Sequence, residues 1–137
     1  MFTRFSPAAN RILRLAEQEC RNLNHYYVGA EHLLLALCDE PDQATAVYLA
    51  ELRVSKDQLH AALRRSLGTG EDRMWDGILV TPRVRAIVER AENAAGAGNA
   101  VEPVDLLRAI VAERLSTAAE ILAKSEGNVR RAGSTPG

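Results

Sequence analysis

Two segments of the chain combine a hydroxyl residue with a proline in the way that begins a helix: Ser6-Pro7 and Thr81-Pro82. In each, the hydroxyl can cap the helix, and the proline is preset for the first helical position. The unpaired N–H groups and the helix dipole at such a start favour an anion. Ordinary capping explains the same residues without any ligand, so the pattern alone leaves both interpretations open.

A carboxylate, Glu31, stands at the start of the otherwise apolar segment 31–37. An acid in the first turn of a helix complements the helix dipole, which is a purely structural role. Close to an anion-binding helix start, the same carboxylate would suit a ligand with a phosphate at one end and a cation at the other. The spacing of these residues does not predict whether Glu31 and a helix start that binds an anion lie near each other.

Motifs of catalysis are absent from the sequence: it contains no GxxxxGK[ST] loop, no GxSxG motif and no HExxH motif. His25 and His32 with Glu31 could form a metal cluster, but the turn between them defines no ligand geometry. We expect His25 to be a turn residue and His32 a partly buried, hydrogen-bonded helix residue. The sequence therefore predicts a protein that is not an enzyme and that holds no metal or cofactor.

The two cysteines, Cys20 and Cys38, are too few and too differently placed for a disulfide framework or a CxxC site. Cys20 falls on the apolar stripe of its segment, so we expect a small core side chain. Cys38 has no basic neighbour that would lower its pKa, so a nucleophilic role is not expected.

Composition and charge narrow the class of protein. The chain has 137 residues, of which 47% are hydrophobic and 26% charged, the balance of a globular domain. Its formal net charge of −1 lacks the basic excess of a nucleic-acid binder, which also disfavours a helix-turn-helix domain. No apolar run approaches the roughly 18 residues of a membrane span, and no signal-peptide core is present. We expect a cytoplasmic protein, monomeric in isolation, that binds neither nucleic acid nor membrane.

The elements that would position these residues occur twice. A long helix with apolar residues three and four apart follows Ser6-Pro7, and another follows Thr81-Pro82, 75 residues later. A short, strongly apolar helix comes next in each case, at 31–37 and at 104–110, with an offset of 73 residues. This self-similarity indicates an internal repeat.

We therefore predict an all-α fold of two four-helix repeats related by a pseudo-twofold axis, about eight helices in total. Pro41-Asp42 and Val54-Ser55 open the last two helices of the first repeat, and Gly68 ends the second of these. The corresponding helices of the second repeat are expected at 116–123 and 125–129, the last one degenerate. The expected divisions are a first repeat at 1–68, an inter-repeat loop at 69–80, a second repeat at 81–129 and a flexible tail at 130–137.

Within the inter-repeat loop, residues 78–80 are expected to be extended and to lead into Thr81. The same loop contains Met74 and Trp75. This pair fits either a packed contact between the repeats or an exposed surface for binding.

Part of the sequence resembles a known family. Residues 1–6, the helix at 8–23 and the stretch 24–37, with GAEHLLLAL at its end, resemble the N-terminal repeat domain of Clp-family AAA+ unfoldases. The match is closest to the ClpC branch, covers residues 1 to about 124 and agrees with the internal repeat. The resemblance implies a non-catalytic module that binds substrates or adaptor proteins for a Clp ATPase and its peptidase.

The resemblance also implies a receptor for phosphorylated arginine, with one pocket in each repeat. The start of the first helix takes the phosphate, and a glutamate of the G-x-E-H motif takes the guanidinium. Carried over to this chain, the first pocket is matched by Phe5, Ser6 and Glu31.

The second pocket is matched at Val80 and Thr81. There, however, Val104 stands where the glutamate would be and Asp105 where the histidine would be. A valine offers no counter-charge to a guanidinium, and Asp105 points about 100° away around the helix. We therefore predict one competent site at most. The alternative is a stand-alone regulatory or assembly partner of the Clp complex that binds through an apolar groove and recognises no phosphoarginine.

Overall fold

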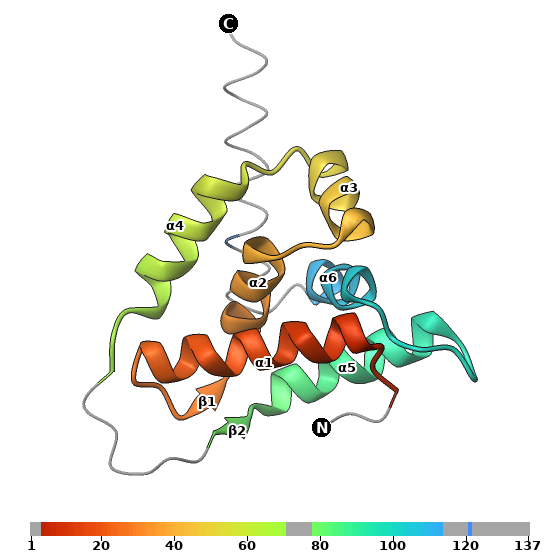
Figure 1. Cartoon of the computed structure of the whole chain (residues 1–137), viewed down its shortest axis with the longest axis horizontal. Helices are drawn as coiled ribbons and strands as arrows, with labels where there is room; N and C mark the ends of the chain where they lie inside the picture. The colour runs from red at the N-terminus through yellow and green to blue at the C-terminus, as the bar shows by residue number, and fades with distance from the viewer. Residues whose placement is uncertain (1–3, 71–77, 114–120, 122–137) are drawn as a thin grey trace, which may run out of the picture.

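A computed structural model describes residues 4–70, 78–113 and 121 of the chain (Figure 1). The described elements, in chain order, are α1 (Pro7–Asn22), β1 (Tyr27–Val28), α2 (Ala30–Asp39), α3 (Gln43–Glu51), α4 (Lys56–Leu67), β2 (Leu79–Val80), α5 (Pro82–Ala95) and α6 (Pro103–Ala112). The all-α prediction is confirmed. The helices expected at 116–123 and 125–129 fall almost entirely outside the described residues, as do Met74, Trp75 and the tail, so the predicted count of eight is not confirmed.

The helix starts follow the sequence signals. The Ser6 hydroxyl oxygen accepts the Ala9 N–H at 3.1 Å, and the Thr81 hydroxyl oxygen accepts the Val84 N–H at 3.2 Å. Prolines at the first helical position follow both caps. Asp42 caps α3 and Ser55 caps α4 in the same way. The predicted capping roles of Ser6 and Thr81 are therefore confirmed.

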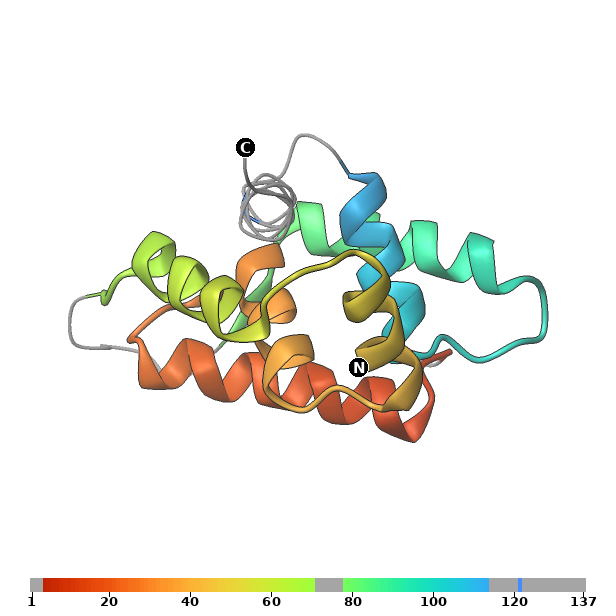
Figure 2. The ribbon, with the colours of Figure 1, turned by 90° about the horizontal axis from the view of Figure 1, so that it is seen from above.

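The core is built from the two short apolar helices and the long helices that cover them. α1 packs on α2 and α5 packs on α6, while α2 and α6 contact each other and so join the repeats. α4 packs on α2 and α3 on α6. Figure 2 shows α1 and α5 on opposite sides, with α2 and α6 between them. Fully buried side chains include Leu33, Leu34, Leu35, Leu37, Leu106, Leu107 and Ile110. In the part of the chain that the structure describes, no helix is long and apolar enough to cross a membrane.

The short extended segments that precede the helices pair between the two repeats and not within one repeat. β1 of the first repeat pairs in parallel with β2, which precedes α5, so that Val28 lies opposite Val80. In the symmetric position, Phe5, which precedes α1, forms a parallel bridge with Val101, which precedes α6. The sequence predicted the extended segment at 78–80 but not its partner, and β1 was not predicted. We call this arrangement the crossed pairing, and it decides which helix starts lie side by side.

Candidate functional site

The start of α5 carries an open backbone hydrogen-bond donor. Pro82 occupies the first helical position and has no N–H, and the Val84 N–H is bonded to the Thr81 hydroxyl. The Arg83 N–H between them has no acceptor within the helix, as for any residue of a first turn. With the positive end of the helix dipole, this backbone can bind an anionic group.

Glu31 lies beside this helix start because of the crossed pairing. The Thr81 N–H donates to the Val28 carbonyl at 3.1 Å, and Glu31 follows Val28 by three residues in the first turn of α2. The Glu31 side chain is half-buried. The structure thus brings the backbone at the start of α5 to Val28, three residues before Glu31 in the chain.

The start of α1 has different surroundings. The Ser6 N–H donates to the Val101 carbonyl at 3.0 Å, so the neighbouring first turn is that of α6, where Val104 is only 9% exposed. The Asp105 carboxylate accepts a hydrogen bond from the Glu102 N–H at 2.9 Å and so caps the start of its own helix. Beside the α1 start lies a hollow of about 390 Å³ whose lining includes Arg4 and Phe5. This helix start therefore has no carboxylate in the position that Glu31 occupies beside α5.

The structure groups the sequence-predicted site residues differently from the sequence analysis, which paired residues within one repeat. Val80 and Thr81 adjoin the strand that leads to Glu31, whereas Phe5 and Ser6 adjoin the segment that leads to Val104. Ser6 and Glu31 lie toward opposite ends of α1. Arg11 near the start of α1 pairs with Glu40 at the end of α2 at 2.6 Å, and the Cys20 thiol near the end of α1 lies 3.3 Å from the Tyr27 carbonyl, next to the start of α2. The grouping could not be found from spacing, because both repeats carry the same signals.

A pair of histidines supports the turn before Glu31. His32 is 5% exposed, and its Nδ1 accepts the Gly29 N–H at 3.0 Å. Its Nε2 lies 2.8 Å from Nδ1 of His25, with the rings edge to face. Burial, and then the charge of His25, lower the pKa of His32 from 6.5 to about 4. The expected hydrogen bonding of His32 is confirmed, and the side chain is buried more deeply than the partial burial that was expected. Within the described ranges, no three His, Cys, Asp or Glu side chains gather as metal ligands.

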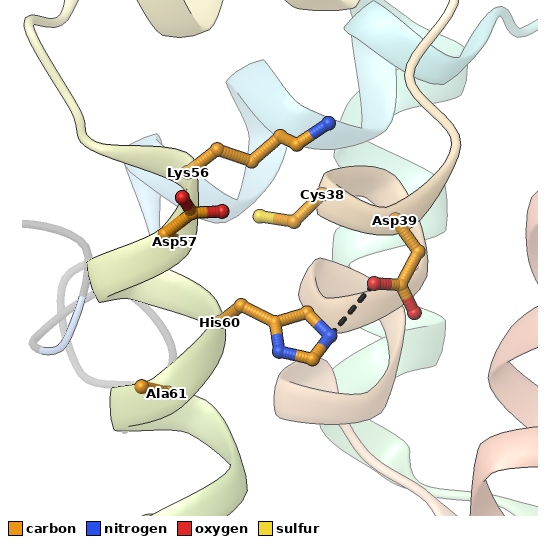
Figure 3. A pocket seen from close by; sticks show the side chains of 6 residues that line it. All are labelled: Cys38, Asp39, Lys56, Asp57, His60 and Ala61. Carbon is orange, nitrogen blue, oxygen red and sulfur yellow. Dashed lines mark ion pairs between the residues drawn. The ribbon is translucent and has the colours of Figure 1, made fainter.

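A second hollow, of about 370 Å³, lies between the end of α2 and the start of α4 and was not predicted (Figure 3). His60 Nε2 contacts the Asp39 carboxylate at 2.7 Å, close to the Cys38 thiol. Lys56 is a basic neighbour of Cys38 that the sequence analysis did not expect. Its effect is outweighed, because burial and then the charge of Asp39 raise the pKa of Cys38 to about 12. Burial and the raised pKa therefore disfavour Cys38 as a nucleophile, despite the histidine and aspartate beside it.

We expect Cys38 to resist alkylation by iodoacetamide at pH 8 in the native chain. With a pKa near 12, only about one Cys38 in ten thousand is a thiolate at that pH, and the side chain is fully buried. Peptide mass spectrometry of samples alkylated with and without 8 M urea measures this for each cysteine. Rapid native labelling of Cys38 would contradict the assignment.

Comparison with known proteins agrees with this architecture. The sequence matches the Clp repeat (R) N-terminal domain family over residues 4–125, and the chain belongs to that family. In Clp ATPases this domain is a substrate- and adaptor-binding module.

Particular relatives include the ATP-binding subunits ClpC of the ATP-dependent Clp proteases of Staphylococcus epidermidis and Staphylococcus aureus, each 30% identical over 96% of this chain. The chain spans 16% of the length of these relatives. Among solved structures, the N-domain of ClpV from Vibrio cholerae has a TM-score of 0.76 at 16% identity, over 93% of this chain and 81% of that one. The N-terminal domain of ClpD from Arabidopsis thaliana has a TM-score of 0.60 at 16% identity, and the match covers 96% of this chain and 100% of that one.

Proposed function

We propose that this chain is a non-catalytic, cytoplasmic protein-binding module that recognises substrates or adaptors for a Clp ATPase and its peptidase. We further propose that it captures phosphoarginine at one site, formed by the start of α5 and Glu31. The phosphate binds the open Arg83 N–H at the positive end of the α5 dipole, and the guanidinium binds the Glu31 carboxylate.

The observation that carries this proposal is the hydrogen bond from the Thr81 N–H to the Val28 carbonyl. It supports the proposal because it joins the residue that caps α5 to Val28, which precedes Glu31 of the first turn of α2 by three residues. In phosphoarginine the phosphate is bonded directly to a guanidino nitrogen, so the two charges are neighbours. A ligand of this kind needs an anion-binding helix start and a carboxylate side by side.

The test is a calorimetric titration of the chain with free phosphoarginine, with arginine and with inorganic phosphate. We expect one binding event with phosphoarginine and none with either half of the ligand. Glu31→Gln should weaken binding by about 10- to 100-fold, because a charge-assisted hydrogen bond contributes about 1.5–3 kcal/mol.

A matched control is Glu102→Gln, which removes the same charge at the exposed start of α6. Binding should be unchanged in this variant. Equal losses from Glu31→Gln and Glu102→Gln would contradict a site at Glu31 and would indicate a general effect of net charge.

One observation favours the alternative, a regulatory or assembly partner that binds the Clp complex without reading phosphoarginine. Tyr27 and Leu79 face each other across the paired strands and are 54% and 47% exposed, so they offer an apolar surface. A partner bound there would not be displaced by phosphoarginine. Competition with phosphoarginine during capture of a Clp partner therefore distinguishes the two functions.

A further inference from the structure

We propose that Tyr27 and Leu79 form a subsite for an apolar side chain of the same polypeptide that carries the phosphoarginine. The chain then binds phosphoarginine best within an extended segment that has apolar residues close to it, as an unfolded protein offers. This inference rests on the proposed function, and it names the class of substrate that the site at the start of α5 takes.

The two side chains form one exposed apolar surface on the paired strands. β1 and β2 run parallel, with Tyr27 directly opposite Leu79 and Val28 opposite Val80. Tyr27 is 54% exposed and Leu79 is 47% exposed, whereas Val28 is fully buried. Neighbouring strands lie about 4.8 Å apart, and residues directly opposite each other share a face of the sheet. Tyr27 and Leu79 are therefore neighbours on the face that water reaches.

Leu79 lies on the same side of its strand as the residue that caps α5. Thr81 has an extended backbone, with φ −70° and ψ 156°, so the strand continues from Leu79 to Thr81. Residues two apart in an extended chain point to the same side, about 6.6 Å from each other. The apolar surface and the start of α5 thus follow one another along one face of the chain.

An extended peptide has the same spacing as β2. Its side chains two residues apart also project to one side, about 6.6 Å apart. A peptide that runs along β2 with its phosphoarginine at the start of α5 brings the side chain two residues away to Tyr27 and Leu79. If that side chain is apolar, it leaves water together with the exposed parts of both residues, which favours binding. Free phosphoarginine has no such side chain.

The other repeat provides an internal comparison. The residues there that correspond to Tyr27 and Leu79 are Ala100 and Arg4, which directly precede the bridge to the start of α1. Arg4 is charged, and its Nη2 donates to two carbonyl oxygens of the segment after α5, at 2.5 and 3.0 Å. The position that carries Glu31 therefore also carries the apolar pair, whereas the corresponding described residues of the other repeat provide neither. Two features that serve one ligand are expected to occur together in this way.

The test is a calorimetric titration of the chain at pH 7.5 with two capped pentapeptides, Leu-Gly-phosphoarginine-Gly-Leu and Ser-Gly-phosphoarginine-Gly-Ser. Leucine at both ends serves either direction of the peptide along β2. We expect the leucine peptide to bind about tenfold more tightly, because part of one leucine side chain is removed from water.

Variants locate the preference on the surface. In Leu79→Ser, and independently in Tyr27→Ser, the preference for the leucine peptide should fall to about twofold or less. The serine peptide reports any general damage in the same variant, so the ratio of the two affinities is the quantity that is compared. The matched control is Val47→Ser, which removes a 51% exposed apolar side chain from α3 and should keep the full preference.

The outcomes separate this inference from the proposed function. Equal affinities of the two phosphorylated peptides, or a preference that persists in both Leu79→Ser and Tyr27→Ser, would overturn the subsite and leave phosphoarginine recognition in place. The same peptides with ordinary arginine test the phosphate. A leucine peptide that binds equally well without the phosphate would overturn both proposals and favour the alternative function, and binding of neither phosphorylated peptide would also overturn both.

Discussion

Replacing Val104 by glutamate (V104E) should give the chain a second phosphoarginine site and raise the calorimetric stoichiometry from one to two. Val104 occupies in α6 the position that Glu31 occupies in α2, and the crossed pairing sets it beside the start of α1. The start of α1 differs from the start of α5 in lacking this carboxylate, and the substitution adds it. Val104 is only 9% exposed, so a carboxylate there loses hydration and costs stability, which the dipole of α6 offsets only in part.

The control for this prediction is V104Q, which has the same shape without the charge and should keep one site. Combining V104E with Glu31→Gln should leave one site again, now at the start of α1. A stoichiometry of one in V104E, in a chain whose site at Glu31 binds normally, would show that the start of α1 does not accept the phosphate.

Acidification should cost the chain about 3 kcal/mol of unfolding free energy through His32 alone. The pKa of His32 is about 4 in the folded chain, against 6.5 for the exposed group. Between these values the unfolded chain holds a proton on His32 that the folded chain does not, so stability falls as pH falls from about 6.5 to about 4. Above pH 6.5 both states are neutral and the effect vanishes. The difference between the two pKa values corresponds to about 3 kcal/mol.

Urea denaturation of the natural chain and of His32→Gln at pH 7 and at pH 4.5 measures this effect. The carboxylates titrate in both chains and cancel in the comparison. The natural chain should lose about 2–3 kcal/mol more than the variant, most of the value expected at pH 4. Equal losses would mean that folding does not lower the pKa of His32.

The sequence predicted most of the fold because its signals are local. A hydroxyl followed by proline caps one helix, and apolar residues at three- and four-residue spacing mark the face that packs. The offsets of 75 and 73 residues revealed the repeat before any contact was known. Each of these features depends on residues within a few turns of each other.

The grouping of the site could not be predicted in the same way. Tyr27–Val28 and Leu79–Val80 are two-residue strands, too short for any alternation of polar and apolar residues. Their partners are decided by long-range packing of α2 against α6. Since Ser6 and Thr81 carry the same capping signal, only the structure shows that Thr81 pairs with Val28, before α2, and that Ser6 pairs with Val101, before α6.

The histidine pair was missed as a unit for a related reason. His25 and His32 are seven residues apart, and with a turn between them this spacing does not predict a contact between their rings. Their contact depends on Asn24, which takes a positive φ of 59° and turns the chain back toward α2. Asn tolerates this conformation better than most residues, which is the weak signal that could have indicated the reversal.

The crossed pairing has a consequence for how such a module can change over time. In a dimer of identical single repeats with the same pairing, both helix-start sites would be copies of one another, and a single mutation would alter both. When the repeats are joined in one chain, each of the two corresponding positions is encoded separately and can mutate on its own. Glutamate at position 31 and valine at position 104 are an example, because one repeat carries a charge where the corresponding position of the other carries none.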